Sequence, residues 1–392
     1  MSERRETFLG ERRATSTDEL RISVVIPYRD RADNLRLALT ALAAQSLPVD
    51  RFEVIVGVLD DGPEHLEILQ EFTGRLDVVA VTSGRPWQVG YARNLALRQA
   101  GGEVVVLMDV DMVLPSRCLE DLYDRHFGYG QRICVVGQMI DYDNNTGDVT
   151  EVEAQPYEHY RKVLDDLQVT GTGDQDPRMS AAHVIPWSFA WTALIALPRS
   201  LVVEQELWFD LGFHGYGVED LEWAYRVART GTPIVMGRDF FGVHLPHVRS
   251  VAANKRTEAP NYRYFLRKWP GVDVELACAF GDFEANELYP EFRRAVEAVA
   301  GASGGVLTVV RGTVDGRTEL AVGVPAGTTG VLPATATGVE VLPITGLALP
   351  YPDGSIDRCH VLGPVTELPE RYRERILAEV RRVAAPASPG MR

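Results

Sequence analysis

Short runs of aliphatic residues alternate with longer amphipathic stretches along the first third of the chain. The apolar runs are ISVVIP from residue 22, FEVIVGVL from 52, DVVAVT from 77 and EVVVLM from 103. The stretches with helical spacing between them are NLRLALTALAAQS, PEHLEILQEFTG and VGYARNLALRQAG. This alternation is typical of a mainly parallel sheet with helices on both faces. We therefore predict an α/β fold.

The remaining pattern divides the chain further. Residues 140–185 are polar and predict a loop-rich insertion around the helical EHYRKVLDDLQ, and apolar character returns at VIPWSFAWTALIALP. A helical stretch ends at GASGG near residue 300, where a smaller segment with strands of its own begins. We predict a flexible polar leader at 1–20, a catalytic domain at 21–275, a helical connector at 276–300 and a small accessory α/β domain at 301–392.

The ends of the predicted strands carry the chemistry. Ligands of open α/β sheets sit outside the carboxyl ends of the strands, and here the last strand runs into Asp109-Val110-Asp111. Alternate side chains of a strand share a face, so Asp109 and Asp111 are expected to point the same way while Val110 points back. Two close carboxylates repel unless a cation lies between them, and Mg2+ or Mn2+ fits because it also accepts phosphate oxygens. The alternative is that both residues only form a turn or cap a helix.

Further polar residues are expected at the same rim. Asp60 follows the second strand in VLDDGP, Arg93 and Asn94 lie in the helix after GRPWQVG, and the histidines of VHLPH follow a later strand. His244 or His247 would complete a metal shell, although a histidine is also common as a buried or surface group without a ligand. Each signal is weak by itself, and their combination favours a binding site.

Composition and charge narrow the class of protein. The 392 residues carry a formal net charge of -15, which argues against a nucleic acid or an anionic membrane as partner. Four scattered cysteines without CxxC spacing suggest neither a disulfide framework nor a zinc thiolate site, so a cytoplasmic location is expected. The first twenty residues lack the apolar core of a signal peptide, and no run has the length of a transmembrane span.

Several motifs in order resemble a known enzyme family. SVVIPYRDRADNLRLALTALAAQ, VLDDG, GYARNLALRQAGGEVVVLMDVDMVLP and GYGVEDLEWAYRVARTG are similar to the family 2 type of GT-A glycosyltransferase. The GxGxED part resembles the galactosyltransferase segment of chondroitin-synthase-like enzymes. The resemblance covers residues 21 to 270 and implies a GT-A fold and a nucleotide-sugar donor.

The resemblance also implies roles for individual residues. Asp220 would be the catalytic base of an inverting displacement, and Glu219 would hold hydroxyl groups of acceptor or donor. Asp111 and Asp109 would contact the Mn2+ or Mg2+ ion, with His244 as a further ligand and His247 as the alternate. The residues implied in donor binding are Pro27, Tyr28, Arg29, Asp60, Arg93, Asp109 and Val110.

Two regions depart from this pattern. Relatives often carry small residues where this chain has Ala190-Trp191-Thr192. Trp187 and Trp191 are therefore predicted to stack on an acceptor ring, with burial in the core as the commoner alternative.

The stretch around PYPDGSID resembles part of a class I methyltransferase domain but has no evident glycine-rich nucleotide loop before it. We expect this partial domain to serve packing, homodimer formation or acceptor placement.

The leading hypothesis is a metal-dependent inverting glycosyltransferase of the hexosyltransferase type, with UDP as the expected carrier. The acceptor is a small metabolite, a glycan or a peptide, and the sequence does not choose among them. A catalytically silent sugar-nucleotide or glycan-binding protein is the alternative. A nucleotidyltransferase is a third hypothesis, but it should carry a glycine-rich loop where this chain has IPYRDRADN.

Overall fold

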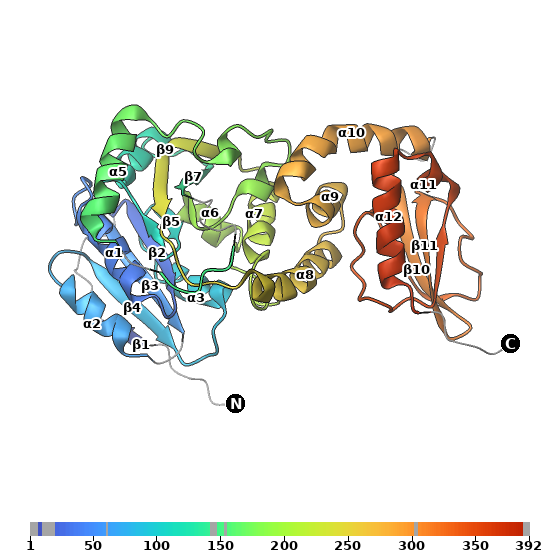
Figure 1. Ribbon diagram of the computed structural model, residues 1–392, viewed down its shortest axis with the longest axis horizontal. Coiled ribbons are helices and arrows are strands. Elements are labelled where there is room, and N and C mark those ends of the chain that lie inside the picture. Colours follow the sequence, from blue (N-terminus) through green and yellow to red (C-terminus); the bar gives the residue numbers. More distant parts are fainter. Residues whose placement is uncertain are drawn as a thin grey trace. The chain divides into compact units, whose positions relative to one another are not determined.

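The computed structural model describes residues 7–9, 20–59, 62–141, 147–152, 155–301 and 305–386. Within these ranges the chain forms two compact units (Figure 1). The first comprises residues up to Ala181 and Pro186–Thr257, and the second comprises Ala182–Ile185 and Glu258 onward. The first unit thus ends before residue 275, the expected end of the catalytic domain. The helices expected to be a connector belong to the second unit.

The first unit is built on a nine-stranded sheet with the order β1-β4-β3-β2-β5-β8-β7-β9-β6. Its strands are β1 (Thr7–Leu9), β2 (Ile22–Tyr28), β3 (Phe52–Leu59), β4 (Val78–Ser83), β5 (Val104–Met108), β6 (Met112–Val113), β7 (Cys134–Ile140), β8 (Leu194–Pro198) and β9 (Ile234–His244). Strands β2 to β5 pair in parallel, as predicted. The pairs β5–β8, β7–β8, β6–β9 and β1–β4 are antiparallel, and β7–β9 is parallel. The predicted fold class is confirmed.

Helices flank this sheet. They are α1 (Ala32–Ala43), α2 (Glu64–Glu71), α3 (Val89–Leu97), α4 (Cys118–His126), α5 (Tyr157–Thr170), α6 (Arg199–Glu204) and α7 (Glu219–Arg229), with the short 3-10 helices Pro177–Met179 and Pro186–Phe189. Helix α3 lies so close to β3 that a Cβ atom on Gly57 would stand 2.1 Å from the carbonyl oxygen of Ala92. Only glycine permits this approach, which fixes the helix that carries Arg93.

The predicted insertion is more ordered than its polar composition suggested. Helix α5 forms as expected, and Tyr160 and Leu164 pack against Ile140. Arg178 is fully buried, where it donates to Asp176 and to the carbonyl oxygens of Phe189 and Gly137. This buried, hydrogen-bonded ion pair holds the segment in position, a role that apolar side chains play in most protein cores.

The second unit has a four-stranded sheet with the order β12-β10-β11-β13. Its elements are α8 (Val251–Lys268, which begins in the first unit), α9 (Val272–Phe280), α10 (Asp282–Ala300), β10 (Leu307–Val314), β11 (Arg317–Pro325), β12 (Thr337–Leu342), β13 (Arg358–Val361), α11 (Gly363–Glu367) and α12 (Glu370–Val383). The β11–β13 pair is parallel and the β10 pairs are antiparallel. This is the small α/β domain that was expected. Its likeness to a methyltransferase domain stays a prediction.

One carboxylate joins helix α9 to the segment that follows β12 in the second unit. Glu275, fully buried, accepts hydrogen bonds from the backbone N–H groups of Thr345, Gly346 and Leu347 at 2.8, 2.5 and 2.7 Å. Tyr372 of α12 also packs on Phe292 of α10, with ring centroids 4.7 Å apart. These contacts explain why α9 and α10 belong to the second unit.

No helix within the described ranges is long and apolar enough to cross a bilayer.

Candidate active site

The chain turns immediately after β5. The strand ends at Met108, and the Met112 N–H donates to the carbonyl oxygen of Asp109 at 3.1 Å. The expected alternation of side chains along a strand therefore does not apply to Asp109 and Asp111. Because they lie in a turn, the two carboxylates have different neighbours. The side chain of Val110, between them, is buried in the core.

Asp111 lies beside both histidines of VHLPH. Its Oδ2 atom is 3.1 Å from Nδ1 of His247 and 3.8 Å from Nε2 of His244. One ligand atom from each of the three residues falls within 4.8 Å of the others. His244 is placed by backbone pairing with Met112, and the Leu245 N–H donates to the Asp111 carbonyl oxygen at 2.7 Å. The structure thus brings together both histidines that the sequence offered as alternatives.

The donor set fits a divalent metal ion. His247 Nδ1 is buried and makes no hydrogen bond with a described residue, despite the nearby carboxylate. A buried nitrogen without a hydrogen-bond partner is costly unless something else satisfies it. Two imidazoles and one carboxylate suit a divalent first-row transition metal better than Mg2+, which prefers oxygen ligands. Asp109 is not a member of this cluster.

The charges around Asp111 keep it ionised. Burial alone would raise the pKa of this carboxyl, but His247, His244 and Arg31 outweigh burial and lower it. Arg31 pairs directly with Asp111. Burial lowers the pKa of His244, which favours the neutral imidazole that binds metals. Asp111 is therefore held in the ionised form and His244 in the neutral form, and both forms bind metal ions.

Arg93 is the centre of a second cluster. The buried guanidinium donates to Asp109 Oδ1 and to Glu219 Oε1, each at 2.9 Å, and lies 5.2 Å from the ring centroid of Phe209. Burial opposes its charge, yet Asp109 and Glu219 raise the pKa of Arg93. Its Nε atom is buried without a hydrogen-bond partner among the described residues. Arg93 thus links the turn after β5 to the start of α7.

A strained turn presents the start of α7. Gly215 and Gly217 have φ angles of +78° and +87°, and Val218 has a φ angle of +76°. That conformation is rare for a β-branched residue and marks a position held by its surroundings. Helix α7 begins at Glu219, whose side chain is 9% exposed and is bound to Arg93. Asp220 is half-buried, and its charge also raises the pKa of Arg93.

Three of the four residues expected to cradle the nucleoside lie at the end of β2. Pro27 and Tyr28 are buried, and burial raises the pKa of Tyr28 to about 12. Arg29 is exposed, and its guanidinium lies 5.7 Å from the Trp87 ring centroid. Asp60, the fourth, lies outside the described residues.

The two tryptophans have different surroundings. Trp187 is 3% exposed and packs edge-on against Tyr225, with ring centroids 5.4 Å apart. This placement favours the core interpretation for Trp187. Trp191 is partly buried and lies 4.4 Å from the guanidinium carbon of Arg178.

Two residues at the site were not predicted from the sequence. Arg31 pairs with Asp111, and Phe209 lies beside Arg93. Arg31 follows a predicted strand end in PYRDR, so its position was a signal of the same kind as that of Arg29. For Phe209 the sequence held no signal, because its contact depends on the Asn94 amide and carbonyl group exchanging hydrogen bonds with the Phe209 backbone.

Several known proteins share sequence similarity with this chain. Residues 23–182 match the family described as "Glycosyl transferase family 2". Validoxylamine A glucosyltransferase from Streptomyces hygroscopicus subsp. jinggangensis is 29% identical over 289 residues, which cover 68% of this chain and 67% of that protein. Chondroitin synthase from Escherichia coli is 26% identical over 227 residues, covering 54% of this chain and 32% of that protein.

Among solved structures, a mannosyltransferase from Pyrobaculum calidifontis in complex with GDP-Man and Mn2+ aligns with a TM-score of 0.45 and 19% identity. The alignment covers 74% of this chain and 78% of that one. Residues 23–182 are thus similar to glycosyl transferase family 2, and the expected class of enzyme, a glycosyltransferase, is confirmed.

Proposed function

We propose that this glycosyltransferase is metal-dependent and inverting, and that it moves a hexosyl group from a nucleoside-diphosphate sugar, with UDP as the expected carrier. The proposal is carried by the Asp111, His244 and His247 cluster at the end of β5. Asp111 of this cluster lies in the same turn as Asp109, which binds Arg93 of α3. A metal site and a buried arginine on either side of one turn suit a diphosphate, which needs positive charge on several oxygens.

The donor is proposed to lie along the carboxyl ends of β2 and β5. Tyr28 and Arg29 would border the nucleoside, and Arg93 would face the diphosphate from its position between Asp109 and Glu219. Asp111, His244 and His247 would hold the metal ion, which when bound supplies positive charge to the departing diphosphate. Arg31, now paired with Asp111, is then available to a phosphate oxygen.

Asp220 is proposed as the general base. In the reaction the bond from the sugar C1 atom to the phosphate oxygen breaks, and its electron pair stays on the nucleoside diphosphate. An acceptor hydroxyl or amine forms the new bond to C1 from the opposite face, and its proton goes to the Asp220 carboxylate. Glu219 already binds Arg93, so it is better suited to positioning than to taking the proton.

The acceptor proposed for the first test is a small polyhydroxylated molecule, because the validoxylamine A glucosyltransferases match more of this chain than chondroitin synthase does. Trp191 is proposed to contact it, since Trp187 is buried. A cytoplasmic location and a homodimer remain predictions.

The test combines donor binding with turnover. A panel of UDP-, GDP- and dTDP-sugars is added with Mn2+ or with EDTA, and thermal shift and nucleotide release are measured with and without validoxylamine A. We expect stabilisation by one donor that requires both the metal and Asp111. Asp111→Asn should abolish it, and Asp124→Asn, an exposed aspartate on α4, serves as the matched control.

The outcomes separate the hypotheses. Stabilisation that survives in Asp111→Asn or in EDTA would remove the metal site from the proposal. Donor binding without nucleotide release under any condition would favour a silent binding protein. Full turnover in Asp220→Asn would remove the assigned base and leave the donor site intact.

A further inference from the structure

The turn that precedes α7, residues 211–218, leads toward the proposed base Asp220 and is held at both ends. At its entry, the Gln88 side-chain amide donates to the carbonyl oxygens of two residues of the turn, at 2.8 and 2.7 Å. At its exit, Glu219 accepts a hydrogen bond from Arg93. The middle of the turn is held by a residue that has no part in the proposed reaction.

That residue is Thr257 of α8, which belongs to the first unit. Its Oγ1 atom accepts a hydrogen bond from the Tyr216 N–H and donates one to the Asn254 carbonyl oxygen, each at 3.0 Å. The hydroxyl thus binds its own helix with its hydrogen and the turn with a lone pair. The side chain also lies against Gly215, because a Cβ atom on that glycine would stand 2.6 Å from Cβ and Cγ2 of Thr257. Thr257 therefore contacts the turn through both its hydroxyl and its carbon atoms.

The backbone conformation of the turn needs such support. Val218 has a φ angle of +76°, which costs free energy in a β-branched residue and persists only where the surroundings fix it. Thr257 makes its hydrogen bond two residues before Val218. Without this bond the strained backbone would have more freedom to relax, and Asp220, in the first turn of α7, would move with it.

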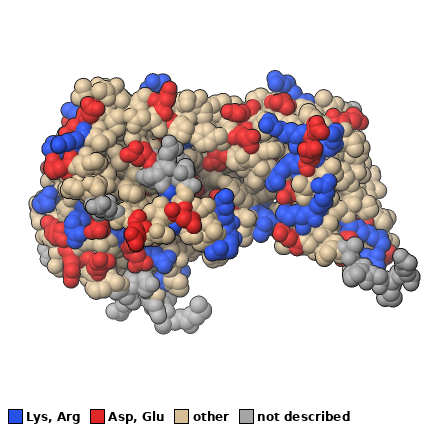
Figure 2. All heavy atoms as spheres, in the orientation of Figure 1, with Lys and Arg blue, Asp and Glu red and all other residues tan. Residues whose placement is uncertain are grey.

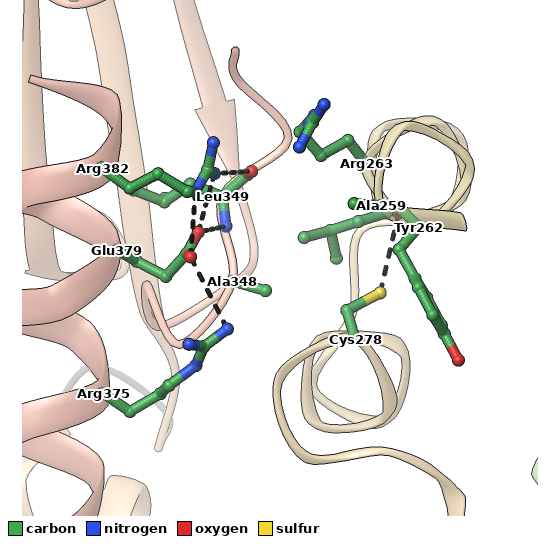
Figure 3. Close-up of a pocket in the computed structure, with 10 residues that line it drawn as sticks. Ala259, Tyr262, Arg263, Cys278, Ala348, Leu349, Arg375, Glu379 and Arg382 are labelled. Carbon is green, nitrogen blue, oxygen red and sulfur yellow. Dashed lines mark hydrogen bonds and ion pairs between the residues drawn. The ribbon is translucent and has the colours of Figure 1, made fainter. Parts of the chain in front are cut away.

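Helix α8 is itself fixed beyond Thr257. It continues to Lys268, and in the second unit the Cys278 thiol of α9 donates to the carbonyl oxygen of Tyr262 at 3.6 Å (Figure 3). Burial raises the pKa of Cys278 well above its ordinary value, so the thiol keeps the hydrogen that it donates. Thr257 thus lies on a helix that packing holds, and not on a free loop.

We propose that Thr257 is a positioning residue for the general base, because its hydroxyl holds the 211–218 turn in the conformation that places Asp220 against the acceptor. This inference rests on the proposed function, since it needs Asp220 to take the proton. Thr257 acts through the backbone of the turn and takes no part in the bond changes. A small displacement of a catalytic group lowers the rate of the chemical step even when the substrates still bind.

The test measures kcat and KM for nucleotide release, with Mn2+, validoxylamine A and UDP-, GDP- and dTDP-sugars as donors. Thr257→Val removes the hydroxyl and keeps the branched shape. It should lower kcat about three- to tenfold, while KM for the donor changes less than about twofold. Thr257→Ser returns the hydroxyl and should return kcat toward the parent value. A structural role alone would not produce this division between kcat and KM.

The matched control is Thr230→Val. Thr230 is also a partly buried threonine of the first unit, and its hydroxyl donates to the Val227 carbonyl oxygen at 2.7 Å at the opposite end of α7. Its loss should leave kcat as in the parent. All three variants keep the charge of the chain, because the face drawn in Figure 2 carries many charged side chains and a new charge would alter the approach of an anionic donor.

The other outcomes overturn the inference. Absence of nucleotide release by the parent protein removes the proposed function and the role of Thr257 with it, whereas an active parent and an equally active Thr257→Val remove the role of Thr257 alone. Low kcat in Thr257→Ser would show that the hydroxyl is not the cause, and an equal loss in Thr230→Val would indicate general damage. Calorimetry with the donor checks that each variant has the same binding stoichiometry, so that a fall in kcat is not a fall in folded protein.

Discussion

Replacing Arg93 by methionine should destabilise the first unit more than any loss of apolar contact would explain. The side chain is 4% exposed and binds two carboxylates at 2.9 Å. Methionine keeps the contact with Phe209 but leaves Glu219, whose side chain is 9% exposed, as an unpaired buried charge. Breaking a buried pair in this way costs about 3–5 kcal/mol. Asp109 adds less, because its side chain is 29% exposed and water screens its charge.

A second variant separates the unpaired charge from the lost packing. In Arg93→Met/Glu219→Gln the buried negative charge is gone as well, so the double variant should regain part of the lost stability. Urea unfolding followed by tryptophan fluorescence measures this, because five of the six tryptophans lie in the first unit: Trp87, Trp187, Trp191, Trp208 and Trp223. A loss below about 1 kcal/mol in Arg93→Met would refute the reasoning. So would a double variant less stable than the single one.

Three further predictions follow from single contacts. Gly57→Ala should lower the melting temperature of the first unit sharply, since the new Cβ atom would stand 2.1 Å from the Ala92 carbonyl oxygen; Gly62→Ala, with open space around it, should not. Burial raises the pKa of Glu275 to about 7 despite its backbone donors, so the folded state holds this proton more tightly than the unfolded chain. The stability of the second unit should therefore fall as pH rises from about 4.5 to about 7, and Glu275→Gln should flatten thermal unfolding over that range; an unchanged slope would contradict the assignment. His247→Ala should weaken Mn2+ binding measured by electron paramagnetic resonance, whereas His159→Ala, remote in sequence and on α5, should bind Mn2+ like the parent protein.

The parallel pairing of strands β2 to β5 was predictable because an amphipathic helix lies between each apolar run and the next. The antiparallel strand β8 was not, since ALIALP carries the same aliphatic pattern in either direction. At the site, Asp111 and the histidines were predicted to lie at one rim because each follows an apolar strand, and one ligand atom from each lies within 4.8 Å of the others. That Asp109 turns to Arg93 was missed, because a period of two holds only where the strand continues, and here it ends at Met108.

Domain boundaries were equally hard to predict from the sequence. The GASGG segment predicted a boundary near residue 300, but the contacts of a helix, and not its local composition, decide which domain it belongs to. Glu275 and Tyr372 make contacts about 70 and 80 residues away in the chain, at Thr345 and Phe292. No periodic pattern in the sequence encodes contacts at such separations.

The Glu275 contact also determines where the protein can be cut for expression. A fragment ending at residue 300 would keep a buried carboxylate whose three N–H donors had been removed, and a fragment starting at residue 301 would keep the donors without their acceptor. Each fragment would carry uncompensated polar groups at a newly exposed apolar surface. A cut between Glu275 and Thr345 should therefore yield aggregating products, and the second unit should be produced with α9 and α10 attached to its sheet.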